Sequence, residues 1–121
     1  MKVLIVGSNG FLGSHIKSIL NSEYEHEVLE ITGKDQIDIT KYDYLDEYLS
    51  KSRPDVVINC AAFVGGISYG YKYPARMLYE NSLMAINLYN ASQKNKVGKL
   101  INPISNCAYP GNLTTYKEDY F

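Results

Sequence analysis

The stretch “KVLIVGSNGFLGSH”, residues 2–15, decides the fold of this chain. Residues 2–6 form a continuous apolar, β-branched run, which is typical of a strand buried on both faces of a parallel sheet. Glycines follow at positions 7, 10 and 13, and apolar residues then recur at helical spacing from residue 12 to residue 20. The stretch therefore predicts a strand, a glycine-rich turn and a helix in direct succession.

The rest of the sequence alternates strand-like and helix-like segments. Further strands are expected at residues 26–31, 36–39, 55–62 and 99–104. One helix is expected to follow Thr40, which can act as its N-cap, and a long helix is expected from Pro74 to about Asn95. This order predicts an α/β fold with a doubly wound parallel sheet of the Rossmann type, right-handed crossovers and strand order 3-2-1-4-5.

The long helix that begins at Pro74 is expected to be apolar on two sides. Its apolar residues fall into one stripe of Met77, Met84, Leu88 and Ala91 and a second group of Tyr79, Leu83 and Ile86. A helix with two apolar faces needs two packing partners. One is the sheet, and the other is either a second subunit or a part of the protein outside these 121 residues.

The composition narrows the class of protein. The chain is 45% hydrophobic and 21% charged with a net charge of −1, so it lacks the basic surplus expected of a nucleic-acid or anionic-membrane partner. No apolar run near its start is long enough for a signal peptide or a membrane span. Cys60 and Cys107 are isolated, which indicates reduced thiols in a cytoplasmic protein. No metal site is expected, because His15 and His26 do not cluster with the cysteines.

The three glycines predict a dinucleotide site. Gly7, Gly10 and Gly13 have the spacing GxxGxxG between a strand and a helix. The first glycine permits a tight turn, the second lets the backbone approach a pyrophosphate, and the third allows close packing of helix and strand. The amide groups at the helix N-terminus then supply hydrogen-bond donors and a partial positive charge. We therefore assign residues 1–121 to one NAD(P)-binding domain.

The end of the second strand should decide between NAD and NADP. An acidic residue there binds the adenosine ribose of NAD, whereas small and basic residues accept the 2′-phosphate of NADP. Thr32, Gly33 and Lys34 occupy this position and favour NADP. Glu30 favours NAD if it faces the ribose, because period-two alternation puts it on the same face as Thr32; otherwise it is a solvated strand-end glutamate.

Several longer motifs resemble one known family. The motifs are “GSNGFLGSH”, “DIT” at residues 38–40, “NCAA” at residues 59–62, “AAFVGGISYGYKYPARMLYEN” at residues 61–81 and “SNCAYP” at residues 105–110. They resemble the extended short-chain dehydrogenases/reductases that act on nucleotide sugars, and most closely the branch that contains the GDP-L-fucose synthases. Asn106 and Ala108 depart from that branch's pattern. The resemblance implies an NADP-dependent enzyme that epimerises beside a 4-keto group and then reduces it.

The resemblance also implies which residues form the site. The cofactor would be bound by residues of the glycine turn, of the segment after the second expected strand, of the third expected strand, and of the end of the fourth expected strand and the loop after it, namely Gly7, Asn9, Gly10, Phe11, Leu12, Gly13, Thr32, Lys34, Asp38, Ile39, Ala61, Ala62 and Val64. Asp38 and Ile39 would hold the adenine. Gly65, Gly66 and Asn81 would lie near the substrate, although Asn81 serves equally well as structural support for its helix.

Two further residues would take part in catalysis. Ser105 matches a serine that hydrogen-bonds the reacting 4-keto oxygen, and Cys107 matches a cysteine that transfers a proton during epimerisation. Their spacing alone leaves other roles open, because Ser105 can satisfy a backbone group at a strand end and Cys107 can be a small buried hydrophobic residue.

The family's catalytic tyrosine, which has a lysine four residues later, has no counterpart among the twelve tyrosines of this sequence. We therefore expect the chain to be the N-terminal, cofactor-binding part of a longer enzyme, inactive by itself and homodimeric when whole, with a nucleotide-sugar substrate that is GDP-linked. Two alternatives remain. One is a nucleotide-sugar 4-epimerase or dehydratase of the same superfamily, and the other is a non-catalytic NADP-binding module.

Overall fold

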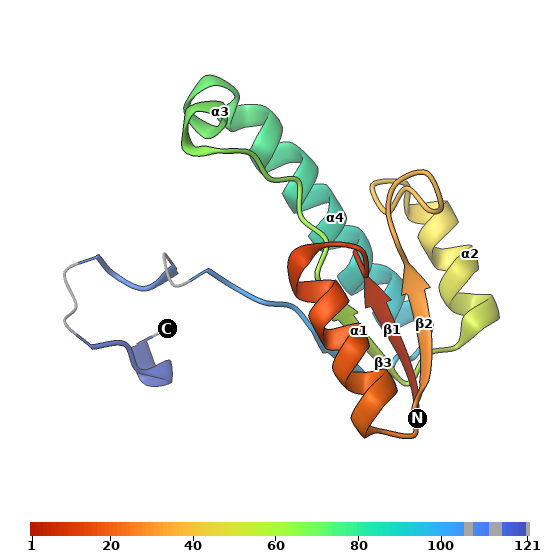
Figure 1. Cartoon of the computed structure of the whole chain (residues 1–121). Helices are drawn as coiled ribbons and strands as arrows, with labels where there is room; N and C mark the ends of the chain where they lie inside the picture. Colours follow the sequence, from red (N-terminus) through yellow and green to blue (C-terminus); the bar gives the residue numbers. More distant parts are fainter. Residues whose placement is uncertain (106–107, 112–114, 121) are drawn as a thin grey trace.

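The computed structural model describes residues 1–105, 108–111 and 115–120. Its elements, in chain order, are β1 (Lys2–Val6), α1 (Phe11–Glu23), β2 (Glu27–Ile31), α2 (Tyr42–Ser52), β3 (Val56–Asn59), α3 (Ile67–Lys72), α4 (Pro74–Lys94), β4 (Lys99–Ile101) and the short 3₁₀ helix η2 (Glu118–Tyr120). Helix α1 covers one face of the sheet, and helices α2 and α4 cover the other (Figure 1). The described residues after β4 run away from this body (Figure 1).

The four strands of the sheet are parallel and have the order β2-β1-β3-β4. In the register of β1, Val3 lies opposite Val28 of β2 and Val56 of β3. Every residue of β1 after Lys2 is buried, as its uninterrupted apolar run predicts for a central strand. The predicted parallel α/β architecture is therefore confirmed, and so is the central position of the first strand.

The main core lies between the sheet and the two helices α2 and α4. It contains Leu4, Val6, Ile31, Ile39, Leu45, Leu49, Val57, Met84, Leu88 and Ala91. Strand residues alternate between the two faces, so Leu4 and Val6 of β1 point to this core while Val3 and Ile5 point to α1. Helix α1 buries only Gly13 fully, and Leu12 and Ile19 stay exposed despite their helical spacing.

The strand predicted at residues 36–39 is wrong. The carbonyl oxygen of Gly33 accepts hydrogen bonds from the backbone N–H groups of Gln36 and Ile37, so the chain turns where the alternation of Ile37 and Ile39 predicts extension. The predicted N-cap is wrong as well, since α2 begins after Lys41 without a side-chain cap. Thr40 donates its hydroxyl hydrogen to Asp38 instead.

Helix α4 has two apolar faces, as its sequence predicts. Pro74 stands in its first turn, Met84, Leu88 and Ala91 are buried, and Met77 is partly buried. On the other side Tyr79 and Ile86 are 64% and 55% exposed. The second face of α4 is therefore largely exposed at Tyr79 and Ile86, whereas its third apolar residue, Leu83, is partly buried.

Two kinds of feature are not found within the described ranges. No helix there is both long enough and apolar enough to cross a membrane. In the same part of the chain, histidine, cysteine, aspartate and glutamate side chains form no group of three or more that could hold a metal ion.

The turn between β1 and α1 depends on a close approach of backbone segments. Gly7 has a φ of +79°, which favours glycine, and a Cβ atom on it would lie 2.8 Å from the backbone nitrogen of Ala61. A Cβ atom on Gly13 would collide with the carbonyl oxygen of Gly7 and lie 2.8 Å from the Cα atom of Ser8. The first and third glycines of the motif thus let helix α1 and the loop after β3 pack against one turn.

We predict that Gly13→Ala lowers the free energy of unfolding by about 3 kcal/mol, because backbone atoms rather than flexible side chains obstruct the new methyl group. Chemical denaturation measures the change. Gly33→Ala is the control, since a Cβ atom on Gly33 meets nothing within 4 Å, and it should change the free energy by less than about 1 kcal/mol. Equal stability of the two variants would contradict the proposed packing of the turn.

Candidate cofactor site

A cleft of about 440 Å³ lies at the carboxyl ends of β1, β2 and β3. Its lining comprises Val6, Gly7, Gly10, Ile31, Thr32, Gly33, Lys34, Ile37, Asp38, Ile39, Thr40, Cys60, Ala61, Ala62, Phe63, Arg76, Glu80 and Met84. In open α/β sheets ligands bind outside the carboxyl ends of the strands, and the volume lies in the range of small-molecule sites. The cleft is therefore the candidate site of the chain.

The cleft contains most of the cofactor residues expected from the sequence. Those that line it are Gly7, Gly10, Thr32, Lys34, Asp38, Ile39, Ala61 and Ala62. The other expected site residues are not in the lining; they are Asn9, Phe11, Leu12, Gly13, Val64, Gly65, Gly66, Asn81 and Ser105. Cys107 lies outside the described residues.

The glycine turn presents backbone groups to this cleft. Gly10 donates its backbone N–H to Gly7 and accepts a hydrogen bond from the backbone N–H of Ser14. Helix α1 begins at Phe11 with no side-chain cap on its first amide groups. These groups remain available to an anionic ligand, and the exposed Gly10 adds no side chain that would keep the ligand at a distance.

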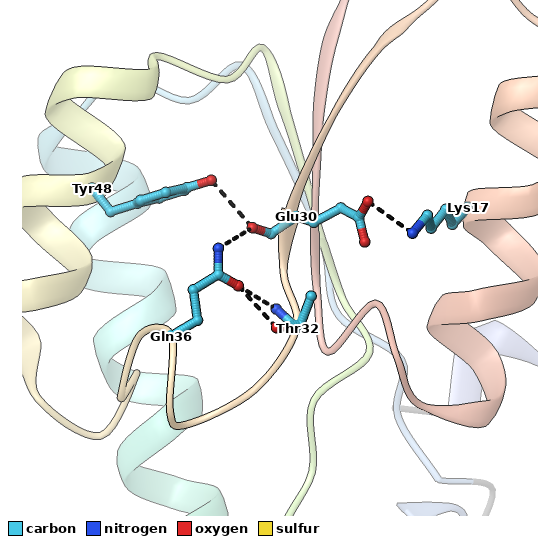
Figure 2. A network of polar contacts seen from close by, with 5 residues as sticks. All are labelled: Lys17, Glu30, Thr32, Gln36 and Tyr48. Atoms are coloured by element: carbon cyan, nitrogen blue, oxygen red, sulfur yellow. Dashed lines mark hydrogen bonds and ion pairs between the residues drawn. The ribbon is translucent and has the colours of Figure 1, made fainter.

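Glu30 points away from the cleft. Its carboxylate lies 2.9 Å from the ammonium group of Lys17 on α1, on the side of β2 opposite Gln36 (Figure 2). The hydrogen bond from Lys17 is the main reason that the pKa of Glu30 lies below its ordinary value. Glu30 is therefore an ionised partner of α1, whereas Thr32 and Lys34 line the cleft.

Asp38 organises the far end of the cleft. Burial opposes its ionisation, but hydrogen bonds from the hydroxyl and backbone N–H of Thr40, together with the ammonium of Lys34, outweigh burial and lower its pKa. The Lys34 nitrogen is 3.4 Å from the carboxylate. Asp38 is thus an ionised acceptor whose second oxygen holds the side chain of Lys34.

Two asparagines of α4 fasten the loops that line the cleft. Asn81 accepts the backbone N–H of Phe63 and donates to the carbonyl oxygens of Phe63 and Met77, each at 2.8 Å. The buried Asn87 donates to the carbonyl oxygen of Ile39 at 2.9 Å. The amide of Asn81 is thus engaged by backbone groups, which supports a structural role; contact of Asn81 with a substrate stays a prediction.

A pair of asparagines, Asn59 and Asn102, links the loop at Ala61 to the segment that carries Ser105. Asn59 accepts the backbone N–H of Ala61 and donates to the side chain of Asn102, with a nitrogen–oxygen distance of 2.7 Å. Ser105 follows three residues later, is exposed, and accepts the backbone N–H of Ala108. Its role in catalysis stays a prediction.

The sequence analysis missed several residues of the lining. The guanidinium of Arg76 lies 5.2 Å from the centre of the Phe63 ring, and its nitrogen is 4.0 Å from the carboxylate of Glu80. The spacing of Arg76 and Glu80 by four residues was the available signal, since such pairs share a helix face. Burial raises the pKa of the Cys60 thiol, so this cysteine is a neutral wall residue near neutral pH.

The sequence of the chain matches a known family. Residues 3–121 match the model of the NAD dependent epimerase/dehydratase family. The chain belongs to this family.

The chain is similar in sequence to two GDP-sugar synthases and in structure to a dTDP-sugar reductase. The GDP-L-colitose synthase of Yersinia pseudotuberculosis is 34% identical over 91% of this chain and 35% of its own length. The GDP-L-fucose synthase of Sinorhizobium fredii is 34% identical over 90% of this chain and 34% of its own length. A solved structure of dTDP-4-dehydrorhamnose reductase from Bacillus anthracis in complex with NADP superposes with a TM-score of 0.72, at 30% identity over 82% of this chain and 34% of that one. The chain thus spans about a third of the length of these relatives.

We predict that Asn81→Ala lowers the free energy of unfolding by about 2 kcal/mol, because the Phe63 backbone loses both of its partners on α4. Thermal and chemical unfolding measure the loss. Asn90→Ala provides the control, because Asn90 is an exposed asparagine of the same helix, and a change below about 0.5 kcal/mol is expected. If both variants unfold like the parent chain, Asn81 does not fasten the loop.

Proposed function

We propose that this chain is the cofactor-binding part of an NADP-dependent nucleotide-sugar epimerase/reductase similar to GDP-L-fucose synthase. The observation that carries the proposal is the composition of the cleft where the adenosine ribose is expected. Thr32 and Lys34 line it, while the nearby acid Glu30 is bound to Lys17 on the other side of the strand. A basic residue at this place favours the 2′-phosphate of NADP when no carboxylate is positioned to bind the ribose hydroxyls.

The residues of the cleft fit the parts of a dinucleotide in order along it. Gly7 and Gly10 would let the pyrophosphate approach the turn closely, and the first backbone amide groups of α1 would hold it. Asp38 and the backbone of Ile39 would hold the adenine, and Ala61 and Ala62 would form the wall beside the cofactor. When bound, the reduced cofactor supplies the hydride that reduces a ketone.

The proposed substrate is a GDP-linked 4-keto sugar. Ser105 would donate a hydrogen bond to the keto oxygen and so stabilise the negative charge that develops there. Cys107 would move a proton at the carbon beside that ketone, which becomes acidic when the oxygen is polarised. Gly65 and Gly66 would let the sugar approach the backbone closely. The relatives named above, two of them GDP-sugar synthases, support this substrate class.

We also propose that the whole protein is a cytoplasmic homodimer. The exposed second face of α4, with Tyr79 and Ile86, supports a further packing partner, which is a second subunit or another part of the protein. The isolated cysteines Cys60 and Cys107 support a reducing compartment.

We predict that the chain binds NADP more tightly than NAD, and that Thr32→Asp moves the ratio of the two affinities toward NAD by about 10-fold, because a carboxylate repels the 2′-phosphate and accepts the ribose hydroxyls. Calorimetric titration with both cofactors measures the ratio. Thr115→Asp makes the same substitution at an exposed site after β4 and should leave the ratio unchanged. Tighter binding of NAD by the parent chain would overturn the proposed preference.

In the whole enzyme, Cys107→Ser should nearly abolish incorporation of solvent deuterium beside the ketone, while reduction of an already epimerised substrate survives. Ser105→Ala should slow both steps by about 100-fold, because one hydrogen bond to the developing oxyanion is lost in each. The 121-residue chain alone should bind cofactor without turnover. Equal loss of exchange and reduction in the cysteine variant would make Cys107 a packing residue.

A further inference from the structure

The side chain of Gln36 closes the turn that follows β2. Its Oε1 accepts hydrogen bonds from the backbone N–H of Thr32 at 2.8 Å and from the Thr32 hydroxyl at 3.0 Å, and its Nε2 donates to the carbonyl oxygen of Glu30 at 3.2 Å (Figure 2). The partners fix the orientation of the amide, because a backbone N–H only donates and a carbonyl oxygen only accepts. One exposed side chain thus ties the end of the strand to a turn four residues later.

These bonds determine what Thr32 can offer to a ligand. Both of its hydrogen-bond donors, the backbone N–H and the hydroxyl, are directed at Gln36. Thr32 therefore has only oxygen lone pairs left for hydrogen bonding, so a phosphate in the cleft, which needs donors, gains no hydrogen bond from it. Thr32 favours the 2′-phosphate only in that it is not an acid.

The donor for that phosphate is then Lys34, the one cationic residue between positions 32 and 36. The other cation of the cleft lining, Arg76, lies against the Phe63 ring and 4.0 Å from Glu80 on α4. Lys34 lines the cleft and stands in the turn in which Gly33 accepts the backbone N–H groups of Gln36 and Ile37. The Lys34 ammonium nitrogen lies 3.4 Å from the carboxylate of Asp38, and the side chain of Lys34 is 67% exposed. The place where Lys34 meets a ligand therefore depends on how firmly the turn is fixed to β2.

We infer that Gln36 is a positioning residue for cofactor specificity: it locks the turn so that Lys34 faces the 2′-phosphate, and it keeps the turn free of a further negative charge. This inference rests on the proposed function, that is, on binding of NADP in the cleft. Gln36 does not line the cleft and would touch no reacting atom. It acts through Thr32 and Lys34.

The surroundings of Gln36 allow its role to be tested without loss of the fold. The carbonyl oxygen of Glu30 also accepts a hydrogen bond from the hydroxyl of Tyr48 at 3.3 Å, so it keeps a partner when Gln36 is replaced (Figure 2). The other two bonds involve groups of the exposed Thr32, which water can satisfy. Variants at position 36 should therefore melt within a few degrees of the parent chain.

Two substitutions separate the two parts of the inference. Gln36→Met has the same length and makes none of the three bonds. Gln36→Glu can still accept both hydrogens of Thr32 but lacks the N–H for Glu30 and adds a negative charge. Gln93→Glu is the matched control, since Gln93 is an exposed glutamine of α4 that lies outside the cleft lining.

The measurement is calorimetric titration of each variant with NADP and with NAD at low and high salt. Gln36→Met should weaken NADP binding by about 10-fold, because the charge-assisted bond from Lys34 is misplaced, and should weaken NAD binding by less than about 2-fold. Gln36→Glu should weaken NADP at least as much, and part of its loss should disappear at high salt, where charge repulsion is screened. Gln93→Glu should match the parent chain.

Other results of these titrations would overturn either the role of Gln36 or the proposed function. Equal weakening of both cofactors would reduce Gln36 to general support of the fold, and unchanged binding in both variants would remove any role for it. A parent chain that prefers NADP, together with variants that keep this preference, overturns the inference alone. A parent chain that binds neither cofactor overturns the proposed function and the inference with it.

Discussion

The backbone of Gly7 is the point on which the structure depends. Its N–H bonds the carbonyl oxygen of Ile31 at the end of β2, and its own carbonyl oxygen accepts the N–H of Gly10. Gly13 of α1 and the loop at Ala61 both approach it at distances that exclude a Cβ atom. The ends of β1 and β2, the loop after β3 and the start of α1 all meet at Gly7. The conformation of this one residue, with φ of +79°, therefore determines how these segments pack beside the cleft.

The loops around the cleft are held by hydrogen bonds from neutral side-chain amides. Asn81 and Asn87 of α4, Asn59 of β3 and Gln36 each bond backbone groups of a segment that belongs to no strand or helix. An amide can donate and accept at once without bringing a charge. These four amides therefore fasten the loops without adding charge to a cleft whose lining already contains the carboxylates of Asp38 and Glu80.

The sequence was sufficient for the parts of the fold that depend on local pattern. The buried run 2–6, the glycine spacing and the two-sided helix beginning at Pro74 all specify their structure over a few turns or residues. It was insufficient where a turn has the alternation of a strand. Ile37 and Ile39 alternate as in a strand, but the chain turns at Gly33, and Ile39 is buried and Ile37 partly buried without a strand. The hydrogen bonds that Asn81 and Asn87 make to the loops could not be predicted from local pattern, because they join residues far apart in the sequence. Asn87 and Ile39, for example, are 48 residues apart.

The place where strand β2 ends determines which side of the strand Thr32 faces relative to Glu30. By alternation alone, Glu30 and Thr32 share a face. Strand β2 ends at Ile31, however, and Thr32 directs both its backbone N–H and its hydroxyl to Gln36. Glu30 stays on the α1 side with Lys17, and Thr32 comes to line the cleft. If β2 continued for one more residue pair, period-two alternation would keep position 32 on the side of Glu30 and Lys17. The electrostatics of the cleft thus follow from where the strand stops.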